Sequence, residues 1–188
     1  MTKLEKIKSL CDTKKYCKVK RQIENDVLAS NCGFIIDFSE SFIVFKEVDD
    51  FIVRGNLIFP IDSIVELRRN KNDLFVEKIY KLEGITETIK NVNKIELKSW
   101  ESIFKSIKKI GFNVIVKDEK PNKDTFDIGP IIKVTKTNVS IQYFNACGIL
   151  EDEPTKIKWN QITLVHFDDI YTNIYSKYIK SQTKKIEQ

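Results

Sequence analysis

Two stretches of the chain carry apolar residues at helical spacing. The first predicts a helix over residues 3–11, with Thr2 in position to cap it. The second predicts a helix over residues 95–110 that ends at Gly111. The apolar positions that define them are Leu4, Ile7 and Leu10, and then Trp100, Ile103, Phe104, Ile107 and Ile110. Each helix therefore has one apolar face, which we expect to be buried.

After each helix the pattern changes to short apolar runs typical of β-strands. In the first half the predicted strands cover 32–38, 42–48, 57–61 and 64–67. In the second half they cover 112–117, 128–134, 138–144, 157–159 and 162–167. A closing segment, 73–80 or 169–178, has helix-like spacing that leaves its structure undecided. Around five short strands after one helix suggest a small, strongly bent sheet or barrel in each half.

The two halves match when the sequence is shifted by 96 residues. The matched pairs include Gly33 with Gly129, Ile35 with Ile131, Ser39 with Thr135, and Asp73 with Asp169. Apolar, hydroxyl and glycine positions keep the same order over most of the chain. We therefore predict an ancestral duplication, with a boundary near residues 91–94 and two β-rich repeats, 1–93 and 94–188.

The apolar composition agrees with a strand-rich core. The chain has 28 Ile, 13 Val and 12 Phe against 10 Leu and 2 Ala, and β-branched and aromatic residues favour strands. The predicted fold class is mainly β (α+β), with two small halves that are each preceded by a helix. Two barrels of the Sm-like or Src-homology-3-like kind are the leading architecture. A single continuous sheet across both halves is the alternative.

Several strings in the sequence look like those of a known group of proteins. In the first half they are residues 33–45, 48–51 and 60–64, and in the second half 127–131, 144–148 and 162–165. They hold a Gly-hydrophobic strand, an Asp-Phe corner and an Asp-Ile strand in that order. This arrangement resembles a widespread group of uncharacterised bacterial proteins, over roughly residues 16–180. The resemblance implies the two-repeat architecture and a bacterial source, and it implies no activity.

Length and charge limit the class of protein. The chain has 188 residues and a formal net charge of +5, enough for one ordinary domain or two very small ones. We find no signal peptide at the N-terminus and no apolar run of the ~18 residues that would span a membrane. We therefore expect a cytoplasmic protein with no membrane partner.

The sequence offers little catalytic or metal-binding chemistry. Its four cysteines form no C-x-x-C pair, its acidic clusters lack calcium-loop spacing, and its six glycines are isolated. We expect no metal and no cofactor. The single histidine, His166, lies near Asp168 and Asp169, which could orient it as the base of a hydrolase. Strand alternation instead places His166 on the solvent face, and the protein is expected not to be an enzyme.

One basic stretch has the composition of a nucleic-acid surface. Its residues are Lys14, Lys15, Tyr16, Lys18, Lys20 and Arg21, and Arg68, Arg69 and Lys71 follow a predicted strand. Small β-barrels bind single strands with such basic grooves and aromatic platforms. The modest net charge argues against nucleic-acid binding as the main function. We expect a non-enzymatic binding or adaptor protein with a protein partner, and binding of RNA or single-stranded DNA is the alternative.

Overall fold

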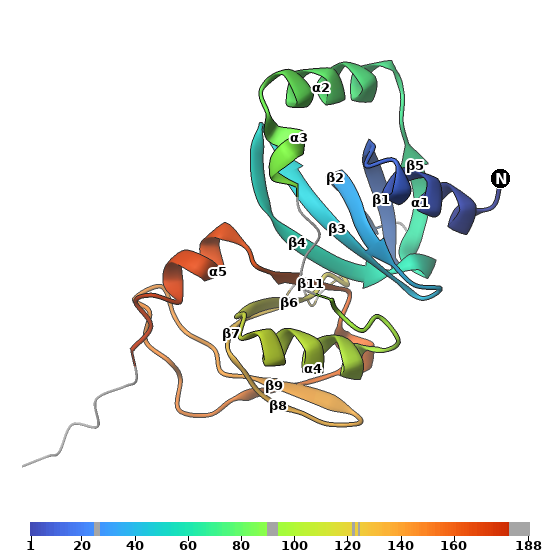
Figure 1. Cartoon of the computed structure of the whole chain (residues 1–188). Helices are drawn as coiled ribbons and strands as arrows, with labels where there is room; N and C mark the ends of the chain where they lie inside the picture. The colour runs from blue at the N-terminus through green and yellow to red at the C-terminus, as the bar shows by residue number, and fades with distance from the viewer. Residues whose placement is uncertain (25–26, 90–93, 122, 124, 181–188) are drawn as a thin grey trace, which may run out of the picture.

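A computed structural model describes residues 1–24, 27–89, 94–121, 123 and 125–180. The fold is mainly β, as the sequence predicted. It contains an eight-stranded antiparallel sheet and a three-stranded antiparallel sheet, and neither closes into a barrel. Figure 1 shows the first half above the second, with the large sheet running through both.

The first half contains three helices and five strands, with a 3₁₀ turn before the last strand. In chain order they are α1 (Lys3–Asp12), β1 (Tyr16–Glu24), β2 (Val27–Phe38), β3 (Phe42–Asp49), β4 (Ile52–Pro60), η1 (Ile61–Ser63), β5 (Ile64–Arg68), α2 (Lys71–Leu82) and α3 (Ile85–Thr88). The strands pair in the order β5-β1-β2-β3-β4. The helix α1 packs on β2, and α2 crosses the open end of this sheet (Figure 1).

The second half repeats this sequence of elements in shorter form. They are α4 (Trp100–Ile110), β6 (Val114–Asp118), β7 (Thr125–Gly129), β8 (Ile131–Val134), β9 (Asn138–Ile141), β10 (Thr155–Lys158), η2 (Trp159–Gln161), β11 (Leu164–Phe167) and α5 (Ile170–Tyr175). Pro130 separates β7 from β8 because proline has no N–H to donate to a ladder. With β7 and β8 taken as one interrupted strand, the pairing order is β11-β6-β7/β8-β9-β10, the order of the first half.

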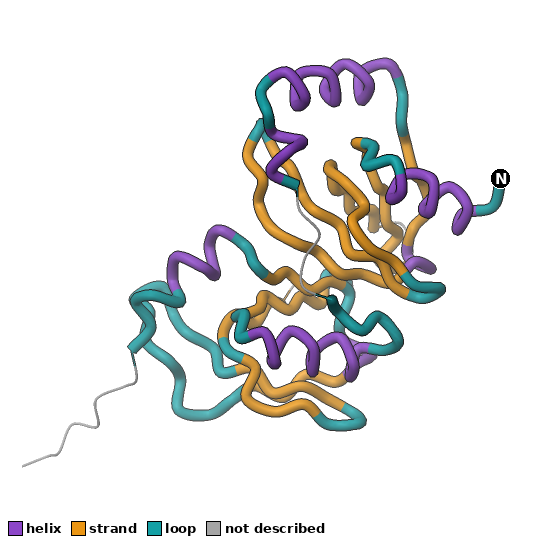
Figure 2. Tube along the Cα trace, in the orientation of Figure 1, coloured by secondary structure: helices purple, strands orange, loops and turns teal. Residues whose placement is uncertain are grey.

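The two halves are joined through a strand pair rather than standing as separate barrels. Strand β4 pairs antiparallel with β11, with Leu57 opposite His166. Figure 2 shows the strands of the two halves meeting at this point. The leading prediction of two separate barrels is not confirmed, and the alternative of a sheet continuous across both halves describes the larger sheet. Without β11, the outer edge of β4 would carry unpaired backbone N–H and C=O groups. Pairing with β11 gives these groups their hydrogen-bond partners. The predicted boundary at 91–94 falls almost entirely outside the described residues.

Side-chain caps determine where the helices begin. Thr2 and Glu5 form a capping box for α1, so the predicted start of that helix is confirmed. Ser99 caps α4, which therefore starts at Trp100 and not at residue 95. Both undecided closing segments are helices. Asn70 caps α2 and Asp169 caps α5, so Asn70, and not Asp73, is the structural counterpart of Asp169.

Two clusters of buried apolar residues hold the fold together. One packs Ile7 and Leu10 of α1 against the strands of the first half and includes Leu164 of β11. The other combines residues of both halves and includes Trp100 and Ile103 of α4. The halves therefore share a core. Leu4 was predicted to be buried, but it is 38% exposed, because the side of α1 that faces the sheet carries Ile7 and Leu10 and not Leu4.

Trp100 connects α4 to the first half, and its removal is expected to be costly. Its ring lies edge-on to Phe42 of β3, with the ring centroids 4.8 Å apart. Replacing a buried tryptophan with alanine costs about 3–5 kcal/mol, so Trp100→Ala should lower the unfolding free energy by that amount. Urea denaturation followed by circular dichroism measures it. Leu4→Ala is the control, and a loss as small as the control's would contradict the placement of Trp100 in the core.

Candidate binding surfaces

The inner face of α2 carries two buried carboxylates that bind the nearby cations. Asp73 accepts two hydrogen bonds from Arg68, at 3.0 and 2.8 Å, and Glu77 accepts one from Arg69 at 2.8 Å. Lys15 Nζ lies 3.4 Å from Glu77. Burial alone would raise the pKa of both carboxyls, but the hydrogen bonds from the arginines and from backbone N–H groups, together with the nearby positive charges, lower both pKa values.

Several cations of the basic stretch and of residues 68–69 are already paired with carboxylates. Lys15, Arg68 and Arg69 are engaged by α2, and Lys20 lies 3.7 Å from Glu66. Tyr16 is buried and packs edge-on against Phe34 and Tyr80, so it offers no stacking platform. Lys14 is exposed and Lys18 is partly buried. The sequence signal for this outcome was the i, i+4 spacing of Asp73 and Glu77.

Arg21 does not lie on a surface. It is 1% exposed, and its guanidinium donates to both carboxylate oxygens of Glu119, at 2.8 and 2.9 Å. The same group lies over the ring of Phe59, 4.8 Å from the centroid. Arg21 belongs to β1 and Glu119 follows β6, so this ion pair links the two halves. Burial favours a raised pKa for Glu119, but Arg21, together with Thr163 and Lys117, lowers it.

His166 lies between β4 and β6 and is mostly buried, which corrects the expectation of a solvent-facing side chain. Burial, with Lys117 as the next cause, lowers its pKa to about 3. A base with that pKa accepts a proton poorly at neutral pH. The neighbouring carboxylates are engaged elsewhere, because Asp169 caps α5 and Asp168 accepts from Asn173. The hydrolase hypothesis gains no support from this geometry.

Four exposed apolar side chains lie close together on α5 and the turn after it. We call the side chains of Ile170, Tyr171, Ile174 and Tyr178 the α5 surface, and they are 40%, 48%, 50% and 67% exposed. Within α5 only Thr172 is buried. Tyr171 stacks on Tyr175, with the ring centroids 4.5 Å apart. This stacking holds the Tyr171 side chain of the α5 surface in place. The sequence did not reveal this surface, because the helix-like spacing of 169–178 left the structure of the segment undecided.

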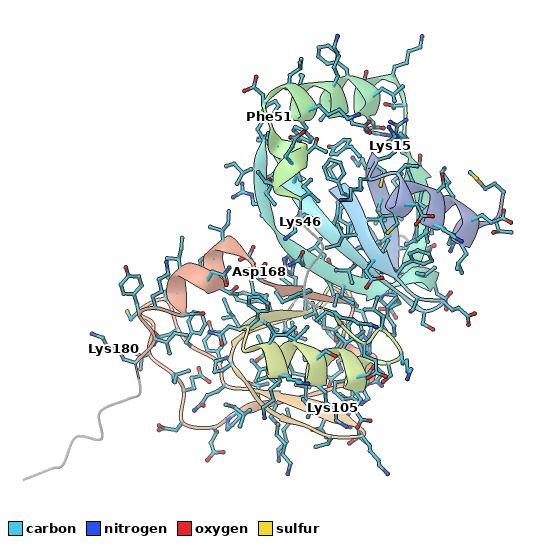
Figure 3. The ribbon with its side chains drawn as sticks, viewed as in Figure 1. Lys15, Lys46, Phe51, Lys105, Asp168 and Lys180 are labelled. Carbon is cyan, nitrogen blue, oxygen red and sulfur yellow. The ribbon has the colours of Figure 1, made fainter. Side chains whose placement is uncertain are left out.

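A glycine allows α5 to lie close to the first half. A Cβ on Gly55 of β4 would be 2.7 Å from the Cα of Asp169, the cap of α5. Beside this contact is a polar hollow of about 370 Å³, lined in part by Glu47, Arg54 and His166. Figure 3 shows Lys46 and Asp168 in the same region, where the halves meet. Burial lowers the pKa of Lys46, and Asp168 partly offsets this effect.

Among the described residues, no group of three or more His, Cys, Asp or Glu side chains could hold a metal ion. No helix in the described part of the chain is long and apolar enough to cross a membrane. No protein-family model, curated protein or solved structure matches the chain.

Proposed function

We propose that this chain is a non-enzymatic adaptor that binds a protein partner through the α5 surface. The observation that carries the proposal is the exposure of Ile170, Tyr171, Ile174 and Tyr178 on one short segment. Contiguous exposed apolar side chains are typical of interaction sites, and tyrosine is enriched at protein interfaces. The stacked Tyr171 and Tyr175 rings are already ordered, which lowers the entropy cost of binding.

We also propose that the two halves arose by duplication of one Sm-like or Src-homology-3-like unit. The common pairing order supports this. So does a shared detail of backbone geometry: Gly33 has φ +152° and Gly129 has φ +151°. The turns after them agree as well. The Ser39 N–H donates to the Phe42 carbonyl at 2.8 Å, and the Thr135 N–H donates to the Asn138 carbonyl at 2.9 Å.

The adaptor proposal predicts which substitutions abolish partner binding. A Tyr171→Ser, Ile174→Ser double variant should lose the partner, because it removes two of the most exposed apolar contacts of the α5 surface. Substitutions of exposed side chains usually change stability by less than about 0.5 kcal/mol, so the fold should be kept. The measurement is affinity purification from the native cell, followed by titration of the identified partner with purified wild type and variant.

The matched control is a Phe75→Ser, Leu82→Ser variant. These two side chains are also exposed, at 64% and 75%, but they lie on α2 in the other half. The control should bind the partner as wild type does. Equal binding by all three proteins, or an equal loss in both variants, would contradict the assignment of the α5 surface.

The alternative of nucleic-acid binding through residues 14–21 keeps little support. Of the cations it needs, Lys15, Lys20 and Arg21 lie against Glu77, Glu66 and Glu119 respectively. A phosphate would have to displace these carboxylates, and the one beside Arg21 is partly buried. Binding at this stretch remains a weaker proposal than the α5 surface.

A further inference from the structure

A wide hollow runs along the outer face of α4 and the segment before it. Its volume is about 860 Å³, and four of its eight lining residues are lysines: Lys94, Lys98, Lys105 and Lys109. Among the described residues of the lining, Glu96 is the only acidic one. We call this hollow the α4 groove. Figure 3 labels Lys105, which marks its position on the second half.

The periodicity of α4 explains why the lysines gather there. Trp100, Ile103, Phe104 and Ile107 form the buried face of the helix. Lys105 and Lys109 are four residues apart and project from the outer face, about 6 Å from each other along the helix axis. Lys98 and Lys94 extend the row of cations beyond the N-terminus of α4. The groove is therefore an extended basic track, longer than a site for one phosphate needs to be.

The cations of the α4 groove are available to a ligand. Lys98 pairs with Glu96 at 2.7 Å, and Lys105 pairs with Glu101. Both lysines are well exposed, and exposed pairs are weak and screened by salt, so a phosphate can replace the carboxylate. In the described part of the chain, no ion pair involves Lys94 or Lys109. This differs from Arg21, Arg68 and Arg69, which are bound to buried or partly buried carboxylates.

We propose that the α4 groove binds single-stranded nucleic acid through its phosphates, without selecting bases. Lysines are flexible point charges that contact phosphates without the fixed two-pronged geometry of arginine. None of the described residues that line the groove is aromatic, so they offer no platform for a base to stack on. Its two serine hydroxyls donate to backbone carbonyls, Ser102 to Glu96 and Ser106 to Ser102, each at 2.8 Å. The described lining of the groove therefore has few groups left that could recognise a base or a 2′-hydroxyl.

The test is a fluorescence-anisotropy titration of labelled oligouridylate and oligothymidylate. Three phosphate contacts predict a log–log salt slope of about −2, hence a loss of affinity of roughly 20-fold between about 50 and 200 mM salt. The Lys98→Ala, Lys105→Ala, Lys109→Ala triple variant should bind at least about tenfold more weakly at low salt, with a shallower slope. Its far-UV circular dichroism should equal that of wild type, since all three side chains are on the surface.

The control is a Lys14→Ala, Lys18→Ala, Lys20→Ala triple variant, which loses the same charge from the other basic stretch. It should keep most of the wild-type affinity. An equal loss in both variants would mean that net charge alone drives binding, and the groove would be rejected. Absence of binding at low salt would also reject it, and so would a preference of more than about tenfold between the two oligonucleotides. The proposal is independent of the α5 surface, whose variants should bind nucleic acid normally.

Discussion

Replacing Arg21 with methionine is expected to lower the unfolding free energy by about 3–5 kcal/mol. The substitution leaves Glu119, 18% exposed at its side chain, without the partner that lowers its pKa. It also removes the guanidinium from the ring of Phe59. Because Arg21 and Glu119 come from different halves, the loss should weaken the contact between halves as well as the local strands. Urea denaturation at neutral pH, followed by circular dichroism, measures the change.

Two further variants separate the buried pair from a general effect of charge. Lys20→Met removes the adjacent cation, which has only the exposed Glu66 as its partner, and should cost less than about 1 kcal/mol. The Arg21→Met, Glu119→Leu double variant removes both charges, and it should recover much of the stability lost in the single variant. Equal losses for Arg21→Met and Lys20→Met would contradict the description of Arg21 as a buried link between the halves.

Features set by nearby residues were predictable from the sequence. Thr2 indicated the start of α1, and the turns at Ser39 and Thr135 were found because a hydroxyl there bonds the backbone two and three residues on. The strands around these turns were predicted close to their observed positions. Strand β1 was read mainly as a basic stretch, because its lysines alternate with apolar residues and Arg21 follows Lys20 directly. In a strand, that alternation places Val19 in the core and Lys18 and Lys20 on the other face.

Features that depend on distant contacts were not predictable from one sequence. Arg21 looked like a surface cation, and only the approach of Glu119 from the second half explains its burial. Which strand edge pairs with which is also a tertiary choice, so the β4–β11 junction could not be told apart from two free barrels. The α4 groove left a readable signal: Lys105 and Lys109 follow the helical spacing opposite the apolar stripe of Trp100. The hollow beside them comes from the packing of the segment before α4.

Alanine at Gly33 or Gly129 is expected to destabilise the fold by a similar, large amount. A Cβ at Gly33 would lie 2.0 Å from the carbonyl oxygen of Lys46, and a Cβ at Gly129 would lie 2.0 Å from that of Gln142. Both glycines also have φ values near +150°, which side chains rarely adopt. Backbone strain of about 1–3 kcal/mol and an overlap cost of about 1–3 kcal/mol give a loss of roughly 2–6 kcal/mol for each variant.

Gly111→Ala serves as the control for these two variants. Gly111 ends α4 at φ +93°, and no atom lies within 4 Å of the position that its Cβ would take. Its replacement should cost only the left-handed backbone penalty of about 1–2 kcal/mol. Chemical denaturation of the three variants gives the comparison. A large loss of stability for Gly33→Ala, with a loss for Gly129→Ala no greater than that for Gly111→Ala, would show that the close backbone contacts at Gly33 and Gly129 are not equivalent. The proposal that the halves derive from one duplicated unit would then lose its most specific structural support.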